Sequence, residues 1–176
     1  MLYDIQFESD GQYALEDPFG SRIVEYGSDV TIVATSVMTL EARRAASFMK
    51  ASGIYPEIID LHSISHPDHS LIFNSVKKTG RLIVLDTSWA QYGVAAEINR
   101  IVNERDPAVL KVRAISLGMN HSPCPTAKTL EDLYYPDVHD IVRAVYDLLP
   151  ENKSLNLPLP PKQSMTDFYK HFKGPF

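Results

Sequence analysis

Three of the six histidines lie within eight residues of one another, which raises the question of a metal site. His62 falls in an expected loop, His66 precedes a proline, and His69 falls in the first turn of an expected helix. A zinc site of the HExxH type needs two histidines four residues apart on one helix, which this arrangement does not supply. Solvated loop histidines are the favoured interpretation, and we predict no metal ligand.

The single cysteine, Cys124, follows His121 by three residues, and these two residue types serve nucleophilic catalysis when they are paired. A nucleophilic cysteine needs a lowered pKa and a base within hydrogen-bonding reach. Pro123 and Pro125 flank Cys124 in an expected loop, and no expected helix begins beneath it. We therefore predict an incidental cysteine and no catalytic residue.

The sequence contains no glycine-rich phosphate loop. The turn after the first expected buried strand, residues 35–38, reads TSVM, and neither GxGxxG nor GxxxxGK[ST] occurs. We predict no cofactor-binding residue. The strand ends near Thr35, Asp60, His62 and Asp86 leave open a second hypothesis, a free-standing small-ligand-binding α/β domain or enzyme, because open α/β sheets bind ligands at such ends.

Four aromatic residues in expected loops are the candidates for an interface or a ligand loop: Trp89, Tyr92, Tyr134 and Tyr135. Aromatic side chains are enriched in protein interfaces, so these loops predict self-association of the chain. The alternative is that these side chains only plug the loops onto the core.

Residues 27–61 set the elements that must position these loops. Val30 to Ala34 is a short run rich in β-branched residues, which predicts a strand buried on both faces. Residues 40–49 place apolar side chains at helical spacing, with Thr39 as the expected N-cap and Gly53 as the expected stop. Residues 57–61 read as a second strand, so this stretch is a β-α-β unit.

The rest of the chain continues the alternation of strands and helices. The expected elements are an edge strand over 22–26, a helix opening at 66–68 and stopped by Gly80, a strand over 81–86, a helix over 93–103, a strand near an edge over 109–116, and a helix over 137–149. We expect a polar loop over 118–126. Helices that separate successive strands predict a mostly parallel sheet with helices on both faces.

Composition excludes several classes of protein. The 176 residues carry a net charge of -5 without long runs of one sign, which argues against nucleic acid as a partner. No apolar run approaches the roughly 20 residues of a membrane helix. The acidic start, MLYDIQFESDG, lacks the pattern of a signal peptide, and one cysteine fits a reducing compartment, so we expect a cytoplasmic protein.

Three segments follow from these patterns: an arm or connector over 1–26, a domain over 27–149 and a proline-rich tail over 150–176. Prolines 158, 160 and 161 predict that the tail leaves the domain as a stiff spacer. Beyond it, the aromatic residues Phe168, Tyr169, Phe172 and Phe176 predict packing on a neighbouring subunit or on the same domain, with a disordered tail as the alternative.

Several motifs in series resemble the transketolase C-terminal domain family: GSDVTIVATS, EIIDLHSISHPDHSLIFNSVKKTGRLIVLD, YGVAAEI and PCPTAKTLEDLYYPDVHDIVRAV. They run from about Gly27 to Leu149, and they are most similar to the C-terminal half of the beta subunit of thiamine-diphosphate-dependent 2-oxo acid dehydrogenases of the pyruvate and branched-chain types. The chain departs from the family at residues 86–89, DTSW, where paired acids are common, and in the length of its tail.

The resemblance implies a three-layer α/β/α sandwich around a five-stranded, mostly parallel sheet with one antiparallel edge strand. It implies a non-catalytic assembly and partner-binding role in a 2-oxo acid dehydrogenase or a transketolase-like enzyme, in which thiamine diphosphate and Mg bind elsewhere in the parent enzyme. The chain is then not expected to be active alone, because the activating glutamate belongs to a different domain. The implied partners are a second copy, the pyrimidine- and pyrophosphate-binding domains or subunits, and the acyltransferase core.

Overall fold

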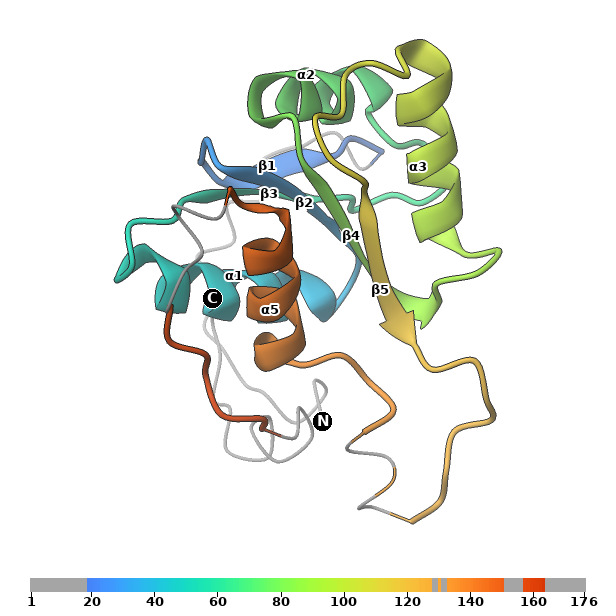
Figure 1. Ribbon diagram of the computed structural model, residues 1–176. Helices are drawn as coiled ribbons and strands as arrows, with labels where there is room; N and C mark the ends of the chain where they lie inside the picture. The colour runs from blue at the N-terminus through green and yellow to red at the C-terminus, as the bar shows by residue number, and fades with distance from the viewer. Residues whose placement is uncertain (1–18, 128–129, 131–132, 151–156, 164–176) are drawn as a thin grey trace, which may run out of the picture.

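The apolar runs of the sequence form one five-stranded sheet in the computed structural model, which describes residues 19–127, 130, 133–150 and 157–163. The strands are β1 (Arg22–Glu25), β2 (Val30–Ala34), β3 (Pro56–Asp60), β4 (Leu82–Trp89) and β5 (Ile115–Met119). Their order is β1-β3-β2-β4-β5, and only the β1–β3 pair is antiparallel (Figure 1). The predicted mostly parallel sheet with an antiparallel edge strand is confirmed.

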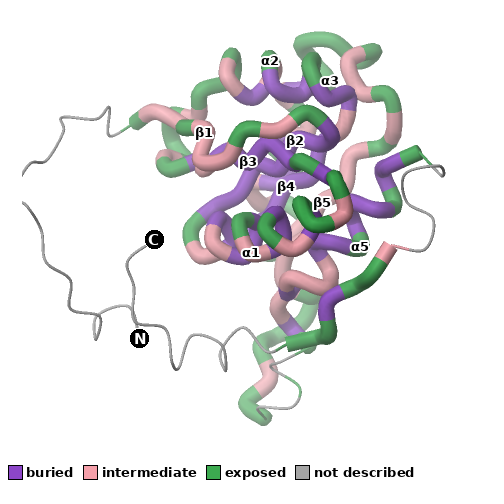
Figure 2. The backbone as a smooth tube through the Cα atoms, turned by 90° about the vertical axis from the view of Figure 1, so that its left-hand side faces the viewer, coloured by how far each residue is buried: buried purple, intermediate pink, exposed green. Residues whose placement is uncertain are grey.

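Two pairs of helices enclose the sheet. α1 (Met38–Lys50) and α5 (Val138–Leu148) pack on one face, and α2 (His69–Thr79) and α3 (Val94–Arg105) pack on the other. Figure 2 shows the buried backbone concentrated in the strands and in the helix turns that face them. The arrangement is the expected three-layer sandwich, with a separate apolar cluster on each side of the sheet.

The helix ends follow the predicted signals except at the start of α1. Asp68 caps α2 by accepting from the amides of Ser70 and Leu71, and Gly80 ends it with a φ of 69°. Gly53 follows the end of α1 and adopts a left-handed backbone conformation with a φ of 73°. The prediction that Thr39 caps α1 is wrong.

Thr39 lies inside the first turn of α1, where its backbone is already helical. Val37 occupies the N-cap position and provides no side-chain hydrogen bond. The hydroxyl of Thr39 instead donates to the Asp60 carboxylate over 3.3 Å, which ties the helix to the end of β3.

Two strand boundaries also differ from the predictions. β4 continues to Trp89, so residues 87–89 are strand and not loop. β5 begins at Ile115, because its register follows β4 from Ile83 opposite Ile115 to Trp89 opposite Met119. The alternation of residues 109–114 misled the prediction. The Val109 amide bonds to the Asp106 carbonyl in a turn, and the Lys111 amide bonds to the carbonyl of Gly80, which ends α2.

Residues 157–163 form an extended segment, here called the strap, that lies against α5. The predicted departure of the proline-rich segment from the domain is therefore wrong for these residues. The calls on residues 1–18 and on Phe168, Tyr169, Phe172 and Phe176 lie outside the described residues. Among the helices of the described ranges, none has the length and apolar character needed to cross a membrane.

Close approach of two backbones at Gly27 generates a testable prediction. A Cβ at this position would lie 2.3 Å from the backbone of Pro56, where the chain enters β3. We expect Gly27→Ala to lower the free energy of unfolding by about 3 kcal/mol, because backbone atoms cannot move aside cheaply. Gly53→Ala is the control: it meets no atom within 4 Å and should cost only about 1 kcal/mol for its left-handed φ. Urea unfolding of both variants checks this, and equal losses would contradict it.

Candidate functional site

Three of the four predicted aromatic residues gather at the carboxyl ends of β4 and β5. The indole nitrogen of Trp89 donates to the Tyr134 hydroxyl over 3.3 Å, and that hydroxyl donates to the Ser122 carbonyl over 2.8 Å. The rings of Tyr134 and Tyr135 meet edge to face with centroids 5.0 Å apart. His121, which sequence reasoning weighed as a base, packs its ring 5.1 Å from that of Trp89. We call Trp89, His121, Tyr134 and Tyr135 the aromatic cluster.

The members of the aromatic cluster differ in exposure. Tyr134 is only 5% exposed, so its side chain packs its loop against the core, which agrees with the alternative interpretation for this residue. Trp89 lies in β4 and is 44% exposed. Tyr92 is 97% exposed in the turn before α3. The interface interpretation of all four residues stays a prediction.

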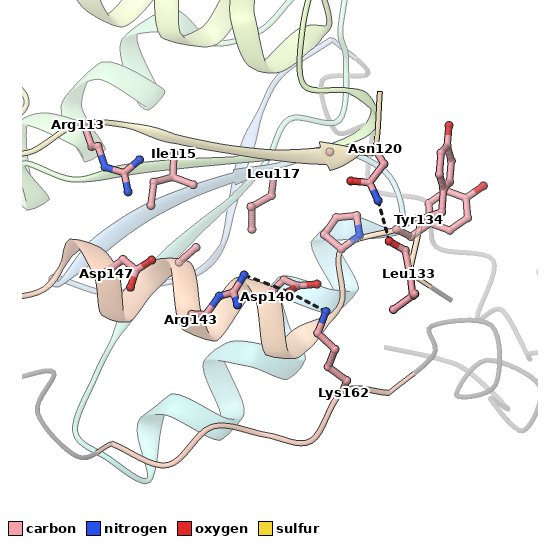
Figure 3. Close-up of a pocket in the computed structure, with 14 residues that line it drawn as sticks. Arg113, Ile115, Leu117, Asn120, Leu133, Tyr134, Asp140, Arg143, Asp147 and Lys162 are labelled. Carbon is pink, nitrogen blue, oxygen red and sulfur yellow. Dashed lines mark hydrogen bonds and ion pairs between the residues drawn. The ribbon is translucent and has the colours of Figure 1, made fainter. Parts of the chain in front are cut away.

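A groove of about 320 Å³ runs beside the cluster, between the free edge of β5 and the outer face of α5 (Figure 3). Ile115 and Leu117 on β5 and Ala144 on α5 provide its apolar surface. Tyr134 and Tyr135 line one end, so the groove and the aromatic cluster form one continuous site. The lining residues are Arg113, Ile115, Leu117, Gly118, Asn120, Leu133, Tyr134, Tyr135, Pro136, Asp140, Arg143, Ala144, Asp147 and Lys162.

Charges of both signs border the groove. Asp140 lies 3.3 Å from the Lys162 ammonium and 3.8 Å from the Arg143 guanidinium. Asp140, Arg143 and Asp147 share one side of α5 because they are spaced by three and four residues. Exposed ion pairs of this kind contribute little stability and mainly select what can bind beside them.

The strand ends of the small-ligand hypothesis are occupied by internal hydrogen bonds. Asp86 is 2% exposed and accepts from the Thr35 hydroxyl over 3.4 Å and from the Ser88 hydroxyl over 2.7 Å. Asp60 accepts from Thr39 and from the amide of His62 over 3.3 Å and 3.2 Å. These carboxylates therefore hold the ends of their own strands together.

The remaining chemical candidates are also engaged locally. Cys124 is exposed, with its sulfur 3.8 Å from the Tyr135 hydroxyl. His66 contacts Ser65 over 2.9 Å and the ring of Phe19. In the described part of the chain, no three His, Cys, Asp or Glu side chains gather to hold a metal ion.

Sequence reasoning missed the groove, although one signal was present. Polar residues 140, 143 and 147 alternate with the apolar stripe of α5 at helical spacing, which marks a second face of that helix. The partner of that face is β5, whose position was predicted too early in the chain. Without the correct strand, Arg113 and Leu117 cannot be placed opposite α5.

Comparisons with known proteins agree with this geometry. The family model described as the transketolase C-terminal domain matches residues 20–141. The acetoin:2,6-dichlorophenolindophenol oxidoreductase subunit beta of Cupriavidus necator is 37% identical over 81% of this chain and 42% of its own length. The mitochondrial pyruvate dehydrogenase E1 component subunit beta of Pisum sativum is 41% identical over 72% of this chain and 36% of its own length.

A solved structure gives the same fold. A split-gene transketolase, described as an inactive beta4 tetramer, superposes with a TM-score of 0.69 at 26% identity, covering 81% of this chain and 45% of that one. The chain thus spans about two fifths of the length of the curated relatives cited above.

The bridging hydroxyl of Tyr134 yields a testable prediction. Tyr134→Phe leaves the Trp89 nitrogen and the Ser122 carbonyl without this partner, so we expect a loss of about 1 to 2 kcal/mol in the free energy of unfolding. Tyr92→Phe, at a fully exposed ring, should change it by less than about 0.5 kcal/mol. Chemical unfolding measures both, and a neutral Tyr134→Phe would show that the bridge contributes nothing.

Proposed function

This chain belongs to the transketolase C-terminal domain family, and from that premise we propose that it is a non-catalytic assembly and partner-binding part of a thiamine-diphosphate-dependent 2-oxo acid dehydrogenase. The relatives named above are beta subunits of multi-subunit enzymes, which supports the assignment to a beta subunit. We retain the division into a connector over 1–26, a domain over 27–149 and a tail over 150–176 as part of this proposal, and a cytoplasmic location as well.

Support comes above all from large apolar side chains that remain exposed around the carboxyl ends of β4 and β5. Trp89 is 44% exposed, Tyr92 97%, Leu130 54% and Leu133 61%. An apolar surface of this kind favours a protein partner, and the groove beside it adds polar groups at its border. In our proposal this surface packs on a second copy or on the cofactor-binding parts of the same enzyme, and the acyltransferase core is a further candidate partner.

Our proposal places thiamine diphosphate and Mg²⁺ in other parts of the parent enzyme. In its support, no cluster of three metal-ligating side chains occurs among the described residues, and the buried Asp86 carboxylate accepts hydrogen bonds from the hydroxyl groups of Thr35 and Ser88.

Isothermal titration calorimetry tests this assignment directly. We expect thiamine diphosphate with Mg²⁺ to give no heat of binding with the isolated chain. Inorganic diphosphate serves as the control for weak binding of anions. Tight, saturable binding of the cofactor would contradict the proposal.

The exposed apolar surface predicts self-association of the isolated chain. We expect its mass in sedimentation to rise with concentration, and Tyr92→Ser combined with Leu133→Ser to weaken the association about tenfold or more. Tyr26→Ser is the matched control, because Tyr26 is 76% exposed but follows β1 at the opposite edge of the sheet. A monomer at all concentrations, or an equal effect of the control, would count against this interface.

A further inference from the structure

The strap, residues 157–163, runs along α5 in the opposite direction to the helix (Figure 1). Its Pro158 contacts Tyr146, its Pro160 contacts His139, and its Gln163 contacts Asp137. The nine steps from residue 146 to residue 137 span about 14 Å at the rise of an α-helix. The five steps from residue 158 to residue 163 span about 16 Å at the rise of a polyproline II helix. The two ends of the strap therefore lie as far apart as an extended, polyproline-like segment would place them along this face.

The inward-facing residues of the strap support the same conformation. Leu157 packs against the core cluster of α1 and α5, and Pro160 is buried. Leu159, between them, is 44% exposed. A spacing of three between inward-facing residues is the period of the polyproline II helix.

The helix face donates hydrogen bonds to the strap. A polyproline II segment has no internal hydrogen bonds, so its carbonyl groups are available to a partner. The Tyr146 hydroxyl donates to the Pro158 carbonyl over 3.1 Å, and His139 Nδ1 donates to the Pro160 carbonyl over 2.7 Å. Burial raises the pKa of the Tyr146 phenol above its ordinary value, so at neutral pH it keeps the proton that it donates.

The far end of the strap is held by charged and polar groups. The Lys162 ammonium lies 3.3 Å from the Asp140 carboxylate. The backbone N–H of Gln163 donates to the Asp137 carboxylate over 3.1 Å. The Arg44 guanidinium donates to the side-chain oxygen of Gln163 over 3.0 Å. This face therefore binds a segment that presents two carbonyl acceptors followed by a basic residue.

We propose that the strap-binding face, formed by Arg44, Asp137, His139, Asp140 and Tyr146, is a recognition site for a proline-rich segment with a basic residue from a partner protein. The chain's own strap occupies this site when the partner is absent. Recognition of extended proline-rich segments by aromatic side chains that donate to their carbonyls is a recurrent mode of peptide binding. The strap shows, in this protein, the chemistry that such a ligand needs.

The occupant that gains from this site is a partner and not a second copy of the chain. Exchange of straps between two copies replaces each contact with an identical one and gains nothing, whereas a partner segment can add contacts of its flanking residues to those of the strap. A partner segment must compete with a strap tethered beside its own site at high effective concentration. We therefore expect weak binding to the intact chain and stronger binding once the strap is released.

A labelled peptide, NLPLPPKQS, with the sequence of residues 156–164, tests the site by fluorescence anisotropy. The 176-residue chain with Pro160→Asp and Lys162→Glu releases the strap but leaves the helix face intact. We expect this chain to bind the peptide about tenfold tighter than the unmodified chain. A peptide with Pro158 and Pro160 replaced by alanine is the control and should bind about tenfold more weakly.

Two further substitutions locate the binding. His139→Ala with Tyr146→Phe, added to the released chain, should weaken peptide binding about tenfold, because both carbonyl donors are lost. If the first release variant fails to fold, as judged by circular dichroism, Lys162→Glu with Gln163→Pro removes three contacts, those to Asp140, Asp137 and Arg44, and leaves Pro160 unchanged.

Three results would overturn the inference: no peptide binding to a folded released chain, binding unaffected by the His139 and Tyr146 substitutions, or a dimer that the peptide dissociates. The last result would identify a second copy as the occupant. The inference is separable from the proposed function, since the strap face excludes Tyr92 and Leu133. Failure here leaves self-association through those residues unchanged.

Discussion

Complete burial of β2 on both faces is the constraint on which this fold depends. Every residue from Val30 to Ala34 is inaccessible to solvent. Such a strand needs apolar layers above and below and a neighbour on each edge, which the two helix pairs and strands β3 and β4 supply. The single hydroxyl on it, Thr31, is accommodated because Ser75 and Thr79 on α2 hydrogen-bond to it over 2.8 Å each.

Burial of the centre leaves only the two edges of the sheet open to contacts beyond the strands. One edge is β1, antiparallel to β3 and irregular between Ile23 and Glu25, which discourages further strand pairing. The other edge is β5, whose residues are all half-buried and whose outer side borders the groove. Strands β2, β3 and β4 have neighbours on both sides, and the edge strand β1 is irregular. The site therefore lies at the other edge, β5.

Sequence reasoning succeeded where local chemistry decides the structure and failed where distant contacts decide it. Gly80 and the apolar run 30–34 carry their own structural preference, so these predictions are confirmed. β5 could not be placed, because its length is set by pairing with Trp89 and Ile83 and not by its own alternation. The groove depends on β5, and it was therefore missed with it. The strap was predicted to be extended, but its contact with α5 was missed. Its hydrogen-bond donors, His139 and Tyr146, lie on α5, and the prediction used only the apolar stripe of that helix.

The first turn of α5 connects the two surfaces of the molecule. Tyr134 and Tyr135 precede this turn directly, and Asp137 opens it with a capping box in which Asp137 and Asp140 exchange hydrogen bonds. The same two carboxylates hold Gln163 and Lys162 of the strap. Because the capping box satisfies the helix end without the strap, release of the strap removes surface contacts and leaves the cap, which is worth about 1 kcal/mol, in place. The buried residues of the α5 stripe, among them Ile141, Val145 and Leu148, remain packed on the sheet. A partner can therefore take the place of the strap while the aromatic cluster keeps its position, since the cluster is held by bonds among Trp89, Tyr134 and Ser122 and the strap by other residues.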